Sequence, residues 1–233
     1  MFLLKRLPSR HIELLFGLLL LLGCYGLIGL LQKQHTSELA FWLALLTLEL
    51  LLPLVIGVLA AGLLAGDTAL DILLTAHRPA WQVLAERLLF LTAVGILAGG
   101  AGLLLSEGWG IMLPKDGVDR IFIWLSPMAF CLGLSSAVAL LRGRMLDGIL
   151  ATMGMMGLSL IMLPLIPRGC AGNPAGTACA WWLASPIMTL GNAADAFWPL
   201  NRLTWLGAGL ALLAISFILA QREEPLLHEV STE

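Results

Sequence analysis

The stretch Ala40–Leu64 decides the fold class and reads AFWLALLTLELLLPLVIGVLAAGLL. Glu49 is its only ionisable side chain, and the remaining residues are almost all aliphatic. A helix needs roughly 20 consecutive apolar residues to cross the hydrocarbon core of a bilayer. This stretch meets that length, so the sequence predicts a membrane-spanning helix here.

Five further apolar stretches of similar length lie on either side of it along the chain. The whole protein has 233 residues, of which 59% are hydrophobic and only 12% are charged, against roughly a quarter charged in an ordinary soluble domain. We therefore expect an all-α membrane protein that forms one transmembrane domain over residues 1–233. The six expected spans cover about 14–31, 40–64, 84–105, 121–141, 146–166 and 203–220.

Positively charged residues predict the orientation, because cytoplasmic loops carry an excess of Lys and Arg. With the N-terminus inside, eight basic residues fall on the cytoplasmic side and five on the other, which favours both ends inside. The cytoplasmic set is Lys5, Arg6, Arg10, Arg78, Arg87, Arg142, Arg144 and Arg222. The opposite set is Lys33, Lys115, Arg120, Arg168 and Arg202. A net charge of −2 shows no basic bias, so nucleic acid is not an expected partner.

Glu49 is the sharpest single feature of the spans. A lone carboxylate near the bilayer centre costs about 2.5–3.5 kcal/mol on insertion scales, so Glu49 should be protonated, or face a protein interior or a water-filled path. Pro53 lies four residues later on the same helix face and predicts a kink. Two readings stay open: Glu49 and Pro53 line a translocation path, or Glu49 is a buried hydrogen-bonded packing residue.

Motifs for catalysis are scarce in this chain. The sequence contains no Gly-Lys pair of a phosphate-binding loop, no His-Glu-x-x-His, no Gly-x-Ser-x-Gly and no Cys-x-x-Cys. We expect no catalytic residue, no metal site and no cofactor bound by this chain. Methionines 153, 155, 156 and 162 favour packing over soft-metal binding. Cys170 and Cys179 flank a short polar stretch and are candidates for a disulfide, or are two free thiols.

The segment between the second and third predicted spans, Gly66–Pro79, reads GDTALDILLTAHRP. Leu70, Leu73 and Leu74 recur at helical spacing, and Asp67 or Thr68 could cap the start of a helix. Pro79 prevents the helix from continuing. The pattern predicts a short amphipathic helix on the cytoplasmic face, which either docks in a groove of a partner protein or lies on lipid.

These stretches resemble the ABC-2-type transporter permeases, the membrane subunits of one class of ABC transporters. The resemblance starts from Asp67–Leu88, an acid and a Leu-rich turn followed by Arg and Pro before the third span. It continues at Ala184–Ile187, with Ser185-Pro186 ahead of the last span, and at Asn201–Leu206, which leads into the final helix. One departure is that Ala65-Gly66 stands where the family has an acid before Gly-Thr.

The resemblance implies six spans with cytoplasmic ends, a coupling helix between spans 2 and 3, and short interfacial helices between spans 5 and 6. It also implies an ABC ATPase subunit that binds ATP and Mg, a second permease copy in a homo- or heterodimer, and surrounding membrane lipid. The expected location is the prokaryotic cytoplasmic membrane, with export as the expected direction. The residues expected to couple to the ATPase are Asp67, Thr68, Leu70, Asp71, Leu73, Leu74, His77 and Arg78.

Two other functions remain open at this stage. The chain could be a membrane anchor or assembly subunit that moves no substrate, or a permease that exports haem or a metal species. The methionines of the fifth predicted span favour the second alternative only weakly. The sequence does not identify a substrate.

Overall fold

The computed structural model describes residues 7–34, 36–65, 80–114, 116–162, 185–187, 189 and 198–230. Every regular element in these ranges is a helix, which confirms the all-α class. The predicted coupling segment and the two candidate disulfide cysteines, Cys170 and Cys179, lie outside the described residues.

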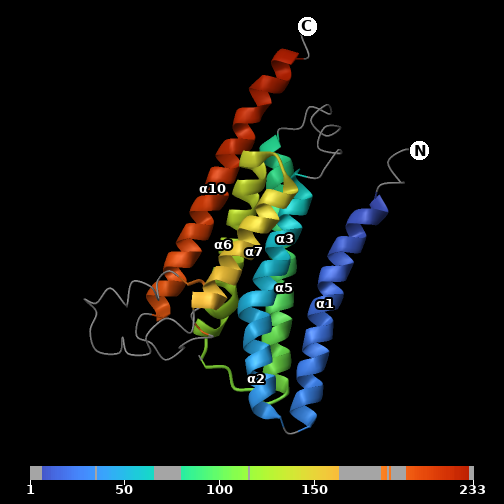
Figure 1. Ribbon diagram of the computed structural model, residues 1–233, viewed down its shortest axis with the longest axis vertical. Helices are drawn as coiled ribbons and strands as arrows, with labels where there is room; N and C mark the ends of the chain where they lie inside the picture. Colours follow the sequence, from blue (N-terminus) through green and yellow to red (C-terminus); the bar gives the residue numbers. More distant parts are fainter. Residues whose placement is uncertain are drawn as a thin grey trace.

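The described helices are long and run roughly along one axis (Figure 1). The second predicted span is one continuous rod made of an α-helix, a single π-helical segment and a further α-helix. In chain order the elements are α1 (Leu7–Lys33), α2 (Ser37–Leu46), η2 (Thr47–Leu51), α3 (Leu52–Ala65), α5 (Ala80–Gly108), α6 (Asp119–Arg142), α7 (Met145–Met162) and α10 (Trp198–Val230).

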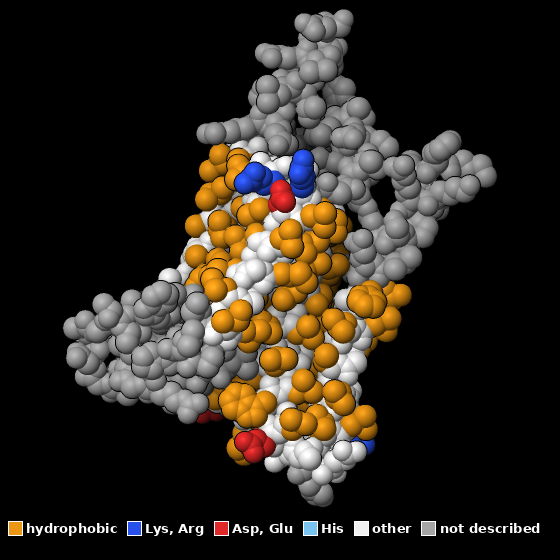
Figure 2. Space-filling model, in the orientation of Figure 1, with side chains coloured by type: hydrophobic (Ala, Val, Ile, Leu, Met, Phe, Trp, Pro, Cys, Tyr) orange, Lys and Arg blue, Asp and Glu red, His pale blue; other side chains and the backbone are white. Residues whose placement is uncertain are grey.

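Five stretches of the described helices are long and apolar enough to cross a membrane. The helix from Met145 to Ile161 is apolar but shorter. Figure 2 shows hydrophobic side chains covering the visible face between the two ends of the bundle, with charged side chains near those ends. These features indicate a multi-pass membrane protein. The five stretches are Leu15–Lys33, Ser37–Leu63, Trp81–Gly108, Asp119–Arg142 and Trp198–Gln221.

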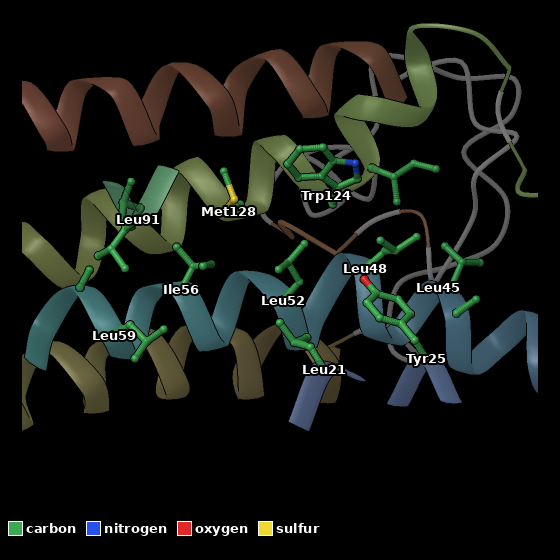
Figure 3. Packing of buried hydrophobic residues seen from close by; sticks show 14 of the residues in the cluster. Leu21, Tyr25, Leu45, Leu48, Leu52, Ile56, Leu59, Leu91, Trp124 and Met128 are labelled. Carbon is green, nitrogen blue, oxygen red and sulfur yellow. The ribbon is translucent and has the colours of Figure 1, made fainter. Parts of the chain in front are cut away.

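Helix α6 lies at the centre of the bundle and contacts α3, α5, α7 and α10. Leu48, Leu52 and Ile56 follow one face of the rod η2–α3 and point toward Trp124 and Met128 of α6 (Figure 3). Because these side chains are buried at 3% exposure or less, they form a packed core inside the apolar bundle rather than a lipid-facing surface.

Glycines of α5 permit its close approach to the core. A Cβ atom added at Gly99 would lie 2.6 Å from the ring of Trp124, and one at Gly95 would overlap the sulfur of Met128. At Gly102 the space is filled by the hydroxyl group of Tyr25, which donates a hydrogen bond of 3.4 Å to the carbonyl of Ala98. Tyr25 therefore ties α1 to α5.

The start of α1 and the end of α10 lie at the same end of the bundle (Figure 1). The turn between α6 and α7 also lies there, and Gly143 makes it with a φ of +65°. This tight turn places α6 and α7 side by side and antiparallel. The turn between α1 and α2 and the start of α10 lie at the opposite end.

Candidate functional site

The π-helical segment η2 forms where Pro53 interrupts the hydrogen-bonding pattern of the second span. Proline has no N–H, so it cannot bond to the carbonyl four residues earlier, which belongs to Glu49. The N–H of Leu52 instead donates to the carbonyl of Thr47, five residues back. Such π-bulges are frequent at functional sites. Glu49 lies inside this segment and is fully buried.

A second proline creates a matching defect in the central helix. Pro127 lies inside α6, so the carbonyl of Ile123 loses its usual helical donor. Arg202 of α10 fills the gap, since its Nη1 donates to Ile123 O at 3.4 Å. The same Nη1 donates to Pro186 O at 2.8 Å. Arg202 thus donates to the carbonyl whose helical donor is missing because residue 127 is proline.

Glu49 and Arg202 form a buried ion pair between the second span and α10. Arg202 Nη2 donates to Glu49 Oε1, and the side chains are only 0% and 1% exposed, with Glu49 the lower. A charged group this deep in an apolar bundle needs a partner of opposite sign. The pair leaves the cluster with no net charge.

Thr189 connects the ion pair to the segment ahead of the last helix. Its backbone N–H donates to Glu49 Oε1 at 2.8 Å. Its hydroxyl oxygen accepts from Arg202 Nη2 at 2.8 Å and from Trp198 Nε1 at 2.9 Å. The ring of Trp198 also lies 5.4 Å from the guanidinium carbon of Arg202, within cation–π range.

The residues before Thr189 are held by the same helix. Asn201 Nδ2 donates to Ser185 O at 2.9 Å, and the N–H of Ile187 donates to Ser185 Oγ at 3.4 Å. Ser185, Ile187 and Thr189 are buried, as are Asn201 and Trp198. The cluster therefore joins four parts of the chain: the second span, α6, the residues 185–187 with Thr189, and the start of α10.

Hydrogen bonds and one ion pair connect the described residues of the cluster, an arrangement that can position segments against one another. Glu49 accepts hydrogen bonds and balances the charge of Arg202. Arg202 also donates to the carbonyls of Ile123 and Pro186 and to the hydroxyl of Thr189. Any movement of the segment 185–189 away from the spans must break this network.

The sequence predicts Glu49 and Pro53 as candidate site residues, and the resemblance marks Ala184–Ile187 and Asn201–Leu206, but nothing in it pairs Arg202 with Glu49. Glu49 and Pro53 lie at the site, buried between helices. Arg202 was counted as a flanking charge outside a last span starting at Leu203, but α10 begins earlier, at Trp198, so Arg202 lies inside the helix. The signal that could have found it is the lone acid, which calls for a basic residue on another span.

The remaining predicted residues fall elsewhere. The coupling residues Asp67–Arg78 lie outside the described part of the chain. The methionines of α7 do not converge, since Met153 is 48% exposed and Met156 is fully buried. In the part of the chain that the structure describes, no three His, Cys, Asp or Glu side chains are grouped as a metal site would require.

No protein-family model, curated protein or solved structure matches this chain. Its function must therefore be argued from its own residues and geometry.

Proposed function

We propose that this chain is the membrane-spanning permease subunit of an ATP-driven transporter of the ABC-2 type, working with a separate ATPase subunit. The observation that carries the proposal is the burial of Ser185 and Pro186, whose carbonyls accept hydrogen bonds from Asn201 and Arg202 of the last span. This Ser-Pro segment is a stretch on which the resemblance rests, and its side of the bundle is opposite the chain ends. It is fastened there by Glu49 and Arg202.

The proposal includes six membrane crossings with both ends in the cytoplasm of a prokaryotic cell. The sixth crossing is α7, whose apolar part from Met145 to Ile161 lies beside α6. Support comes from the position of the first residues of α1 and the last residues of α10 at one end of the bundle, because an even number of crossings returns the chain to the side where it began.

Energy would come from the partner and motion would enter through the segment between α3 and α5. The sequence holds no phosphate-binding loop, and the end of α3 and the start of α5 lie at the same end as the chain ends (Figure 1). Helix α3 continues through Pro53 into the segment that carries Glu49. A push on α3 therefore reaches the buried ion pair directly, and two permease copies would enclose an export path.

Affinity purification in mild detergent tests the class. We expect a soluble subunit with a nucleotide-binding loop to copurify, and expect its ATPase activity to rise when the permease is present. Purification of the folded chain without such a subunit, together with no effect on any candidate ATPase, would instead favour an anchor or assembly role.

Charge reversal tests the coupling segment. In vesicles holding permease and ATPase, we expect Asp71→Arg to abolish transport while ATP hydrolysis continues, because the docking contact would be repelled. Asp147→Arg is the matched control: Asp147 is an acid at the start of α7, at the same end of the bundle but outside the segment. Equal transport by the two variants would sink the assignment of Asp71.

The haem or metal alternative gains no support from the methionines, which face different environments on α7. Dependence of transport on a soft metal or on haem would restore it. The substrate class is left open by the proposal.

A further inference from the structure

Within the described residues, three buried polar atoms lie without a hydrogen-bond partner where α6 meets α10. They are Ser126 Oγ, Arg202 Nε and Trp205 Nε1. The residues that carry them are 0%, 1% and 8% exposed. Buried polar atoms in folded proteins nearly always have a partner, so each of these three calls for an explanation.

The contacts between the two helices place the residues that carry these atoms on the facing sides of α6 and α10. Helices α6 and α10 start at the same end of the bundle and run in parallel (Figure 1). Arg202 bonds to Ile123 O, and the ring of Trp205 lies 4.4 Å from that of Phe130. Ser126 stands three residues after Ile123 and four before Phe130, so it lies on the same face of α6, between those two contacts.

Ser126 also departs from the pattern of other hydroxyls in the bundle. Ser136, Thr152 and Ser159 each donate to the carbonyl four residues earlier, at 2.6, 3.0 and 2.8 Å. Ser135, also on α6, donates across to Gly57 O of α3 at 2.6 Å. The hydroxyl of Ser126 does neither, although it is fully buried.

We propose that one ordered water molecule binds between α6 and α10 at Ser126, Arg202 and Trp205. Its oxygen accepts hydrogen bonds from Arg202 Nε–H and Trp205 Nε1–H, and one of its hydrogens is donated to Ser126 Oγ. A buried water typically makes about three hydrogen bonds, which this set supplies. A small anion offers the same acceptor chemistry, but Glu49 already balances the charge of Arg202.

The water extends the buried network along the central interface. Without it, Arg202 links the second span, the segment 185–189 and α6. With it, Trp205 and Ser126 join the same network, one turn deeper along both helices. The site does not depend on a transport role, because it follows from the packing of this chain alone.

Removing the polar atoms gives a test in which the coupling decides the outcome. If the water is bound, Ser126→Ala and Trp205→Phe each remove one of its hydrogen bonds and lower the melting temperature of the purified protein by a few degrees. The double variant should then lower it by less than the sum, because both changes disrupt one water. Trp205→Phe also removes packing against Phe130, so a loss in that variant alone is not diagnostic. Strictly additive effects of the two changes would overturn the proposal.

Trp124 provides the matched control for this cycle. Its Nε1 is also without a partner, but its ring packs on Gly99 of α5, away from α10. We expect the effects of Trp124→Phe and Ser126→Ala on the melting temperature to add. Coupling of Ser126 to Trp124 as strong as to Trp205 would contradict the assigned position.

The unmodified protein in bilayers gives an independent measurement. Solid-state NMR with ¹⁵N-labelled tryptophan should show transfer of magnetisation from water to the indole N–H of Trp205, identified by the peak lost in Trp205→Phe. Absence of this transfer would refute the site. A melting temperature that falls when chloride is replaced by gluconate would show that an anion, and not water, is the acceptor.

Discussion

At the scale of single residues, the Glu49–Arg202 pair is the feature with the largest energetic consequence. Removing one partner of a buried ion pair leaves an uncompensated charge, which costs about 3–5 kcal/mol. We expect Glu49→Gln to lower the free energy of unfolding by that amount, since Arg202 is only 1% exposed. Chemical unfolding in detergent micelles, followed by tryptophan fluorescence, measures the change.

The bundle offers a control in the exposed pair of Glu107 and Arg120. Their side chains are 50% and 23% exposed, and Arg120 also bonds to Asp116 at 3.0 Å. Surface pairs contribute about 0–1 kcal/mol, so Glu107→Gln should hardly change stability. If Glu49→Gln and Glu107→Gln lowered the free energy of unfolding by similar amounts, Glu49 would not be the counter-charge of a buried arginine.

Removing both charges together should lower the free energy of unfolding by less than removing either one alone. Replacing a buried ion pair with apolar residues of similar volume is often neutral. We expect Glu49→Leu combined with Arg202→Met to be more stable than either single variant, by about 1–3 kcal/mol. Chemical unfolding of the two single variants and the double variant gives the coupling free energy between Glu49 and Arg202. A double variant whose loss of stability equals the sum of the two single losses would contradict this prediction.

The sequence alone identifies Glu49 but not its partner Arg202. An acid inside an apolar stretch stands out in any hydropathy reading, so Glu49 was found. Arg202 was not, because it follows Trp198 and Asn201 near a predicted span boundary, where basic residues are common. Its burial depends on contacts with Ile123 and Pro186, far away in the sequence, and no local pattern reports them.

At the scale of helices, the sequence does not show which glycine of the last span packs against a neighbour. Gly207 and Gly209 both lie in α10, yet nothing lies within 4 Å of a Cβ added at Gly207. The contact is made instead by Gly209, where a Cβ would lie 2.5 Å from the carbonyl carbon of Ala129. The rotation of α10 about its axis is set by its contact with α6, and the local sequence of α10 does not encode that contact.

This difference gives a prediction for α10. We expect Gly209→Ala to lower the free energy of unfolding by about 1–3 kcal/mol, because the added methyl group forces α10 away from the backbone of α6. Gly207→Ala should leave it within about 0.5 kcal/mol, since the space there is open. Thermal unfolding of the two variants side by side checks this, and the reverse order would refute the packing of α10 on α6.

The interior prolines act at the same scale. Pro53 predicts a kink in the second span, and the structure places the π-helical segment η2 there, between α2 and α3. Pro127 leaves Ile123 O for Arg202. At both prolines a backbone carbonyl loses its helical N–H donor, so another group can bond there. The buried network around Glu49 and Arg202 forms beside these two positions.

At the scale of the whole molecule, hydropathy predicts an all-α protein with six spans. The described residues confirm the all-α class and hold five stretches that are long and apolar enough to span a membrane. The reason is that apolar length is a local property. Helix contacts, the central place of α6 and the anchoring of segment 185–189 are non-local, so they come only from the structure. The predicted coupling segment and cysteine pair lie outside the described residues and stay predictions.

Labelling of single cysteines tests the proposed six crossings, in a chain whose four native cysteines are replaced by alanine. Asp116 has a 99% exposed side chain and lies before α6, whereas Arg144 is exposed in the turn after it. With cytoplasmic ends, an impermeant thiol reagent should label Asp116→Cys in intact cells and Arg144→Cys only after permeabilisation.

A fluorescent protein fused to the C-terminus should fluoresce, because an even number of crossings returns that end to the cytoplasm. The opposite labelling would invert the orientation, and correct labelling with a dark fusion would mean that α7 does not cross.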